Sequence, residues 1–334
     1  DAFLLGATER PEEWILRFIE GLPNSWAHSK ETWEVCYRLL RARNLSCDAP
    51  EYLYLFFHGL PRVKKGSASN HAQLKTFFTR DMTLLDQEFW AVFRTEGVLF
   101  KGYGYYKFNG ESAELCRLMG EYFDIRDEIL DALLRGLTSD FSAFNVAMFH
   151  SVYTDLQPTD AENRARFGQL ISALSANPSA SVGFAQTMLQ NVLKACAPSA
   201  LQKNENAELA PLEQVELEQL IDAFGANLYR TEKKIQRGAL RLLKLIATQY
   251  AGLSKAKRKK AQTAEQLALT DYIAERILEA YEVLPLELRG AAEACLPEDR
   301  LPQAEEEEAA AVVSVLASEE LTSRALRTPR SAVH

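Results

Sequence analysis

Four carboxylates lie close together in the sequence and are the first candidates for chemistry. Asp124, Asp127, Glu128 and Asp131 follow one another at a spacing that gathers them around the start of a helix over 124–131. Such a cluster can hold a metal ion, and an enzyme built on it would need a cleft and a histidine such as His150. Because no second helix with a Glu-x-x-His motif accompanies the cluster, the sequence gives a di-metal site little support.

The other reactive side chains show no catalytic spacing. No histidine lies four residues from another histidine or a cysteine, and no nucleophile elbow or phosphate-binding loop is present. The five cysteines are widely spaced and form no C-x-x-C pair, so we expect buried, reduced thiols and a cytoplasmic protein. We therefore expect no catalytic residue, no metal, no cofactor and no small-molecule substrate.

One segment is strongly basic. Residues 229–246 read YRTEKKIQRGALRLLKLI, with apolar positions on one side of a helical wheel and cations on the other. The segment 230–260 holds eleven Lys or Arg and one acid, a surplus of ten positive charges in a chain of net charge −8. The candidate partner-binding residues are Lys233, Lys234, Arg237, Arg241, Lys244, Lys257, Arg258, Lys259 and Lys260.

Three interpretations of this cationic face stay open at the level of sequence. It can be a solvated face with no dedicated ligand, a docking site for an acidic protein surface or for the chain's own Glu305–Glu308 run, or a nucleic-acid contact. Proteins that bind nucleic acid usually present exposed aromatic residues beside their cations. Tyr229 and Tyr250 lie at the helix ends and can equally be packed. The acidic pI of about 5.4 also argues against a chain that coats nucleic acid with its whole surface.

The elements that would position this face are predicted to be helices. Pro11, Pro50 and the two Gly-Leu-Pro stops at 21–23 and 59–61 mark helix ends in the first region. A basic loop over 62–70, a helix over 84–94 and a loop or short β-hairpin over 96–110 follow. Helical periodicity then predicts helices over about 111–123, 126–138, 140–155, 160–176, 179–196, 211–227, 230–251, 264–284 and 286–296.

A weak internal repeat links two of these helices at an offset of about 53 residues. Val182, Leu189 and Leu193 correspond to Ile235, Leu242 and Ile246. Each set occupies the second helix of a helix pair, which is typical of arrays that bury a stripe of each pair against the next. No apolar run of about 18 residues exists, so we expect no membrane span.

Three segments resemble an uncharacterised bacterial family of HEAT-like helical-repeat proteins that is known only as a domain of unknown function. They are EFWAVFRTEG at 88–97, DEILDALLRGLTSDFSAFNVAMFHSVYTDLQPT at 127–159 and YRTEKKIQRGALRLLKLI at 229–246. The resemblance spans about 69–252 and implies a cytoplasmic protein that acts through its surfaces. The family has no established catalytic residues to carry over. Its members are longer, which suggests that this chain is a fragment or a short variant.

The sequence thus predicts an all-α protein, a HEAT-like α-solenoid of antiparallel helix pairs. The expected parts are an irregular N-terminal helical region (1–61), the array (69–296) and an acidic, flexible C-terminal tail (297–334). The expected function is a non-catalytic scaffold or adaptor that binds a protein partner, and an acidic surface of that partner is the candidate contact. The alternative is a nucleic-acid-associated repeat protein that uses residues 230–260.

Overall fold

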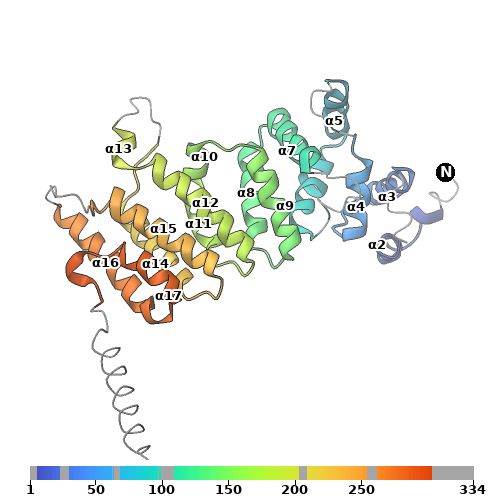
Figure 1. Ribbon diagram of the computed structural model, residues 1–334. Helices are drawn as coiled ribbons and strands as arrows, with labels where there is room; N and C mark the ends of the chain where they lie inside the picture. The colour runs from blue at the N-terminus through green and yellow to red at the C-terminus, as the bar shows by residue number, and fades with distance from the viewer. Residues whose placement is uncertain are drawn as a thin grey trace, which may run out of the picture.

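The computed structural model describes residues 6–22, 30–61, 63, 68–96, 98, 109–202, 209–253 and 262–302 of the chain. Within these ranges the protein is all-helical and contains no strand, as the sequence predicts. The helices follow one another in an elongated array, from α2 near the N-terminus to α16 and α17 at the opposite end (Figure 1). The predicted hairpin at 96–110, the tail beyond Pro302 and Lys257–Lys260 lie outside the described residues, apart from the ends of the hairpin segment.

The first region contains five α-helices and one π-helix among the described residues before the array. Pro50 occupies the first turn of its helix, where its missing N–H costs no hydrogen bond. Trp33 stacks on Tyr37 at 5.1 Å, and a Cβ on Gly59 would lie 2.6 Å from the Trp33 ring, so only glycine fits there. The elements are α2 (Glu12–Glu20), α3 (Lys30–Ala42), α4 (Pro50–Gly59), α5 (Ala68–Arg80), η1 (Leu84–Phe89) and α6 (Trp90–Arg94).

Partly buried ion pairs connect α3 to η1 and to Asp81, just before it. Arg41 of α3 bonds both Asp81, at 2.9 Å, and Glu88 of η1, at 2.5 Å. The hydroxyl of Tyr52 also donates to Glu88, whose side chain is 1% exposed. Burial raises the pKa of Glu88, although Arg41 opposes this shift. A π-helical turn widens the backbone, and here it carries the acceptor that ties α3 and α4 to the rest of the chain.

The remaining helices confirm the predicted periodicity closely. They are α7 (Asn109–Phe123), α8 (Arg126–Thr138), α9 (Ala143–Asp155), α10 (Asp160–Ala165), α11 (Phe167–Ala173), α12 (Ser179–Ala195), α13 (Pro198–Leu201), α14 (Gln214–Leu228), α15 (Lys233–Gln249), α16 (Ala264–Ala280), η2 (Tyr281–Val283), α17 (Leu286–Glu293) and η3 (Glu298–Arg300). Two predictions were wrong in detail. The helix predicted over 160–176 breaks at Arg166, and part of the loop predicted over 62–70 belongs to α5.

From α8 onward the main helices form two layers. Helices α8, α11, α14 and α16 contact one another in sequence and form the first layer. Helices α9, α12, α15 and α17 do the same and form the second layer. Each first-layer helix precedes its second-layer neighbour in the chain, and the linker 229–232 between α14 and α15 is short enough to turn the chain directly back.

One continuous core fills the space between the layers. The residues of the predicted repeat all lie in it, and none of these side chains is more than 2% exposed: Val182, Leu189, Leu193, Ile235, Leu242 and Ile246. Gly136 of α8 permits a close approach to α9, because a Cβ there would lie 2.4 Å from the Phe149 ring. The predicted apolar stripe of α15 is therefore structural.

Side chains also join successive helix pairs through main-chain carbonyl groups. Asn227 donates to the carbonyl oxygen of Leu174, and Arg230 donates to that of Ala176 at 3.0 Å. The hydroxyl of Tyr250 donates to the carbonyl oxygen of Leu193 at 2.7 Å. These donors lie 53 to 57 residues after their acceptors, close to the offset of the sequence repeat.

Candidate interaction surface

Helix α15 positions the cations that the sequence singled out. Its buried side carries Ile235, Ala239, Leu242, Leu243 and Ile246, all 2% exposed or less. The side chains of Lys233, Lys234, Arg237, Arg241 and Lys244 are all exposed. The burial of one side against α12 and α14 fixes the rotation of the helix, so the opposite side must face solvent.

Four of these residues form one line along the helix. Lys234, Arg237, Arg241 and Lys244 follow spacings of three, four and three residues, which place neighbouring side chains on the same side of a helix. At 1.5 Å per residue the line is about 15 Å long. We call these four residues the cationic stripe. Four like charges in a row repel one another, so an anionic partner would relieve that repulsion.

One acidic side chain of the protein already meets this surface. Glu287 of α17 lies 3.3 Å from the Nζ of Lys233 and 3.6 Å from a guanidinium nitrogen of Arg237. All three side chains are at least half exposed, and ion pairs of this kind contribute only about 0–1 kcal/mol. Lys234, Arg241 and Lys244 form no ion pair within the described part of the chain.

Among the other helices of the same layer, α17 carries two acids, Glu287 and Glu293, and one base, Arg289. Helix α12 carries Lys194 as its single charged residue, and α9 carries Asp155 as its single acid. The first layer is different, because α14 carries three acids and no base and α16 carries four acids and one base. Charge is therefore divided between the two layers, and the cationic stripe lies in the layer that is poor in acids.

The carboxylates near the start of α8 serve a structural purpose. The guanidinium of Arg166, only 5% exposed, pairs with Asp127 at 2.7 Å and with Asp131 at 2.8 Å. It also donates to the carbonyl oxygen of Asp127 at 2.8 Å. Glu128 is exposed and forms no ion pair with Arg166. The described residues contain no group of three or more side chains suited to hold a metal ion.

His150 does not join those carboxylates. Its ring stacks on Phe184 of α12 at 5.2 Å, and burial lowers the pKa of the imidazole. All five cysteines are free and buried, as the sequence predicts. Burial raises the pKa of Cys36 and Cys116 to about 12, which keeps these thiols protonated and poorly nucleophilic.

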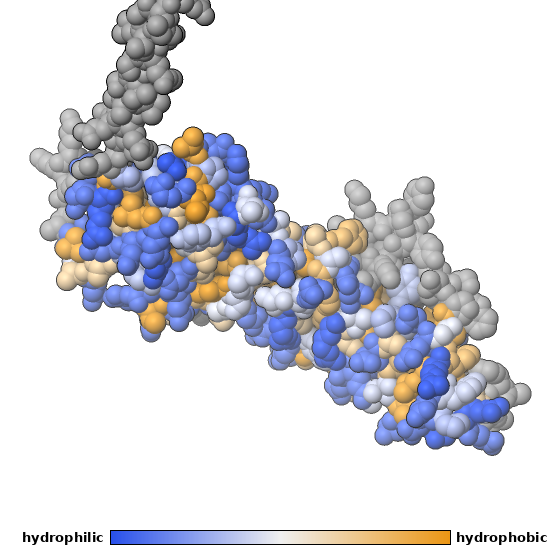
Figure 2. All heavy atoms as spheres, turned by 90° about the horizontal axis from the view of Figure 1, so that it is seen from below, coloured by the Kyte–Doolittle hydropathy of each residue, from blue (hydrophilic) through white to orange (hydrophobic). Residues whose placement is uncertain are grey.

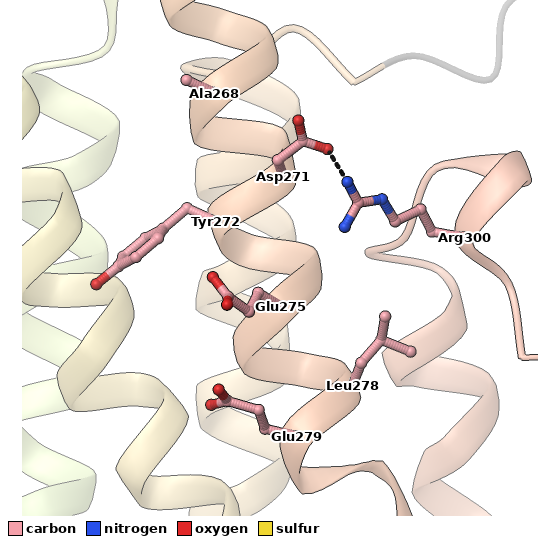
Figure 3. A pocket seen from close by; sticks show the side chains of 7 residues that line it. All are labelled: Ala268, Asp271, Tyr272, Glu275, Leu278, Glu279 and Arg300. Carbon is pink, nitrogen blue, oxygen red and sulfur yellow. Dashed lines mark ion pairs between the residues drawn. The ribbon is translucent and has the colours of Figure 1, made fainter.

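A shallow pocket of about 660 Å³ lies on α16 in the first layer (Figure 3). Asp271, Glu275 and Glu279 project from successive turns of α16, and Arg300 reaches Asp271 across the opening at 2.8 Å. Arg276 pairs with Glu279 and with Asp222 of α14. Two of the three acids thus already have cationic partners.

The face of the molecule seen in Figure 2 is mostly hydrophilic, with hydrophobic residues in separate patches. No helix in the described ranges is both long and apolar enough to cross a membrane. The chain matches no family model, no curated protein and no solved structure. The family resemblance in the sequence therefore stays a prediction.

Proposed function

We propose that this protein is a non-catalytic scaffold or adaptor that docks an acidic protein surface on the cationic stripe. The observation that carries the proposal is the row of four exposed cations on α15, three of which have no ion-pair partner among the described residues. Side chains that are held on a rigid, packed helix lose less freedom on binding than side chains on a loop, which favours specific recognition.

The arrangement of the helices supports a HEAT-like α-solenoid as the framework. Two layers of sequential contacts and polar links at a nearly constant sequence separation are typical of stacked helix pairs. In such arrays each pair contributes one helix to a long shared surface, and partners bind along it. Here α9, α12 and α15 contribute that surface, which is neutral on α9 and α12 and cationic on α15.

An acidic protein fits this surface better than a nucleic acid. Single strands are usually held by aromatic side chains on which bases stack, but Tyr250 is only 8% exposed and its hydroxyl bonds to a carbonyl group inside the core. Tyr229 is exposed at 56%, at the N-terminal end of the stripe, where it can contact a protein partner as readily. The basic residues Lys257, Arg258, Lys259 and Lys260 lie outside the described residues.

The proposal is tested by binding two defined probes to the purified chain. One probe is a synthetic acidic helix with glutamates at spacings of three and four residues, and the other is a single-stranded DNA oligonucleotide. The test variant is Lys234→Glu/Arg237→Glu/Arg241→Glu. The matched control, Arg38→Glu/Lys75→Glu/Arg80→Glu, changes the net charge equally but places the changes on α3 and α5.

We expect the acidic helix to bind the native chain and the control variant, and to bind the test variant at least about 10-fold more weakly. Equal binding to both variants would show that only net charge matters and would refute the docking site. Preferential binding of the oligonucleotide, with a steep loss of affinity as salt rises, would replace the proposal with the nucleic-acid alternative.

A further inference from the structure

A second concave surface lies between α6 and α8, far along the array from the cationic stripe. Its volume is about 660 Å³, within the usual range of about 300–1,000 Å³ for ligand sites. Residues from Ile125 to Ser139 line it, so it follows α8 for about 21 Å at 1.5 Å per residue. We call this surface the α6–α8 groove.

The floor of the groove is apolar and partly aromatic. Phe93 and Ala132 are buried beneath it, with exposed fractions of 4% each. Trp90 and Phe141 are only partly buried and also line it. The rings of Trp90 and Phe93 lie 5.9 Å apart. A partly exposed tryptophan on a packed helix is the side chain most often found at the energetic centre of a protein interface.

Three charged side chains border this floor. Glu128 lies near one end, Arg135 lies two turns further along α8, and Arg94 comes from α6. All three are exposed and form no ion pair within the described ranges, whereas Arg126 on the same helix pairs with Glu162 at 2.6 Å. Glu128, in the first turn of α8, and Arg135, in its last turn, also suit the helix dipole, so each has a small structural value besides any binding role.

The spacing of these groups defines a complementary ligand. Glu128 and Arg135 are separated by seven residues, about 10.5 Å along the helix. In an extended peptide, side chains two residues apart point the same way, and residues i and i+4 lie about 13 Å apart. A basic residue, an apolar residue and an acidic residue at alternate positions would therefore face Glu128, the aromatic floor and Arg135.

We propose that the α6–α8 groove binds an extended peptide segment of about six residues with this alternating basic–apolar–acidic pattern. The length follows from the 21 Å over which α8 lines the groove, and the pattern follows from the two unpaired charges, Glu128 and Arg135, that border its floor. The site is separate from the cationic stripe and does not depend on it, so the protein can hold two segments at once, as an adaptor must.

The test uses fluorescently labelled, end-capped hexapeptides and measures their anisotropy. The main probe reads Lys-Ala-Leu-Ala-Glu-Ala, and companions carry the reversed charge order, Gln in place of both charges, or Lys in place of Glu. The test variant is Arg135→Glu, and the matched control is Lys194→Glu, an exposed cation on α12. Thermal unfolding of each variant measures the loss of the helix-dipole interaction separately from binding.

We expect a peptide with opposite charges to bind the native chain and the control, and to bind Arg135→Glu at least about 5-fold more weakly. The peptide with two lysines should recover that loss in Arg135→Glu, because the reversed charge then meets its complement. A purely structural role of Arg135 cannot produce such recovery. Binding of the neutral peptide with equal affinity, unchanged affinity in the variant, or no measurable binding by any peptide would overturn the proposal.

Discussion

Replacing Gly238 with alanine should destabilise the protein, although alanine is the better helix former. Gly238 lies in the middle of α15, and a Cβ there would lie 1.9 Å from Oε1 and 2.8 Å from Cδ of Gln186 on α12. Gln186 is 3% exposed, and its amide donates to the carbonyl oxygen of Ile235 at 3.0 Å. The added methyl group therefore forces this amide out of its position.

The magnitude follows from three opposing contributions. The lost hydrogen bond costs about 1 kcal/mol, and a buried amide left without its partner costs about 1–3 kcal/mol. The higher helix propensity of alanine offsets this loss by about 1 kcal/mol of stability. The net effect is a loss of about 1–3 kcal/mol in the free energy of unfolding. Propensity alone predicts the opposite sign, so the direction of the change is diagnostic.

Urea denaturation followed by circular dichroism measures this change in a double-mutant cycle. The cycle compares the native chain with Gly238→Ala, Gln186→Ala and the double variant. Once Gln186 is alanine the conflict disappears, so Gly238→Ala should then stabilise, and the coupling between the two sites should be about 2–4 kcal/mol. An increase in stability from Gly238→Ala in the presence of Gln186 would refute the close contact between α12 and α15.

Three further outcomes follow from the same contacts. Glu287→Gln removes the carboxylate that pairs with two cations of α15, so the acidic helix probe should bind up to about 5-fold more tightly. The free energy of unfolding should change by less than about 1 kcal/mol. Weaker binding of the probe would show that Glu287 does not compete with it for these cations. Burial tends to raise the pKa of Asp81, but hydrogen bonds from Thr83, Tyr37 and Arg41 outweigh burial and hold that pKa at about 2. Ionised Asp81 therefore stabilises the fold by about 2 kcal/mol above about pH 4, and this contribution disappears as the pH falls to 2. Asp81→Asn should accordingly flatten the acid limb of a stability–pH curve, and an unchanged slope would show that another group carries it. The buried thiols should resist an aromatic disulfide reagent at pH 8 and all five should react after unfolding, whereas rapid reaction of Cys36 in the native chain would contradict its burial.

Amphipathic periodicity made most of the fold predictable. The rotation of α15 could be read from its sequence because apolar and cationic residues alternate with the helical period, and the structure confirms both sides. Helix α5 was missed because its sequence, ASNHAQLKTFFTR, has too few buried apolar positions to show a helical period; Leu74 and Phe78 are its only two fully buried positions among the described side chains. Tertiary packing, rather than propensity, stabilises that helix.

The candidate sites were predictable only where they lie on one helix. The cationic stripe is local in sequence, so its spacing could be seen directly. The pairing of Glu287 with Lys233 joins residues more than 50 positions apart, and no local pattern marks it. The cluster of Asp127 and Asp131 suggested a metal site in the sequence. In the structure the buried guanidinium of Arg166 pairs with both carboxylates, and this pairing depends on how α10 and α11 pack against α8.

The hydrogen bonds between successive helix pairs run in both directions, because Gln186 of α12 donates to the carbonyl oxygen of Ile235 on the later helix α15. Asn227, Arg230 and Tyr250 each donate to a carbonyl group of the preceding pair. Cys295 does the same with the carbonyl oxygen of Leu240. Detachment of a later pair would therefore leave carbonyl groups of the pair before it without their donors. Loss of an earlier pair would likewise leave buried donors such as Asn227 and Tyr250 without their acceptors, so neighbouring pairs should unfold together from either side.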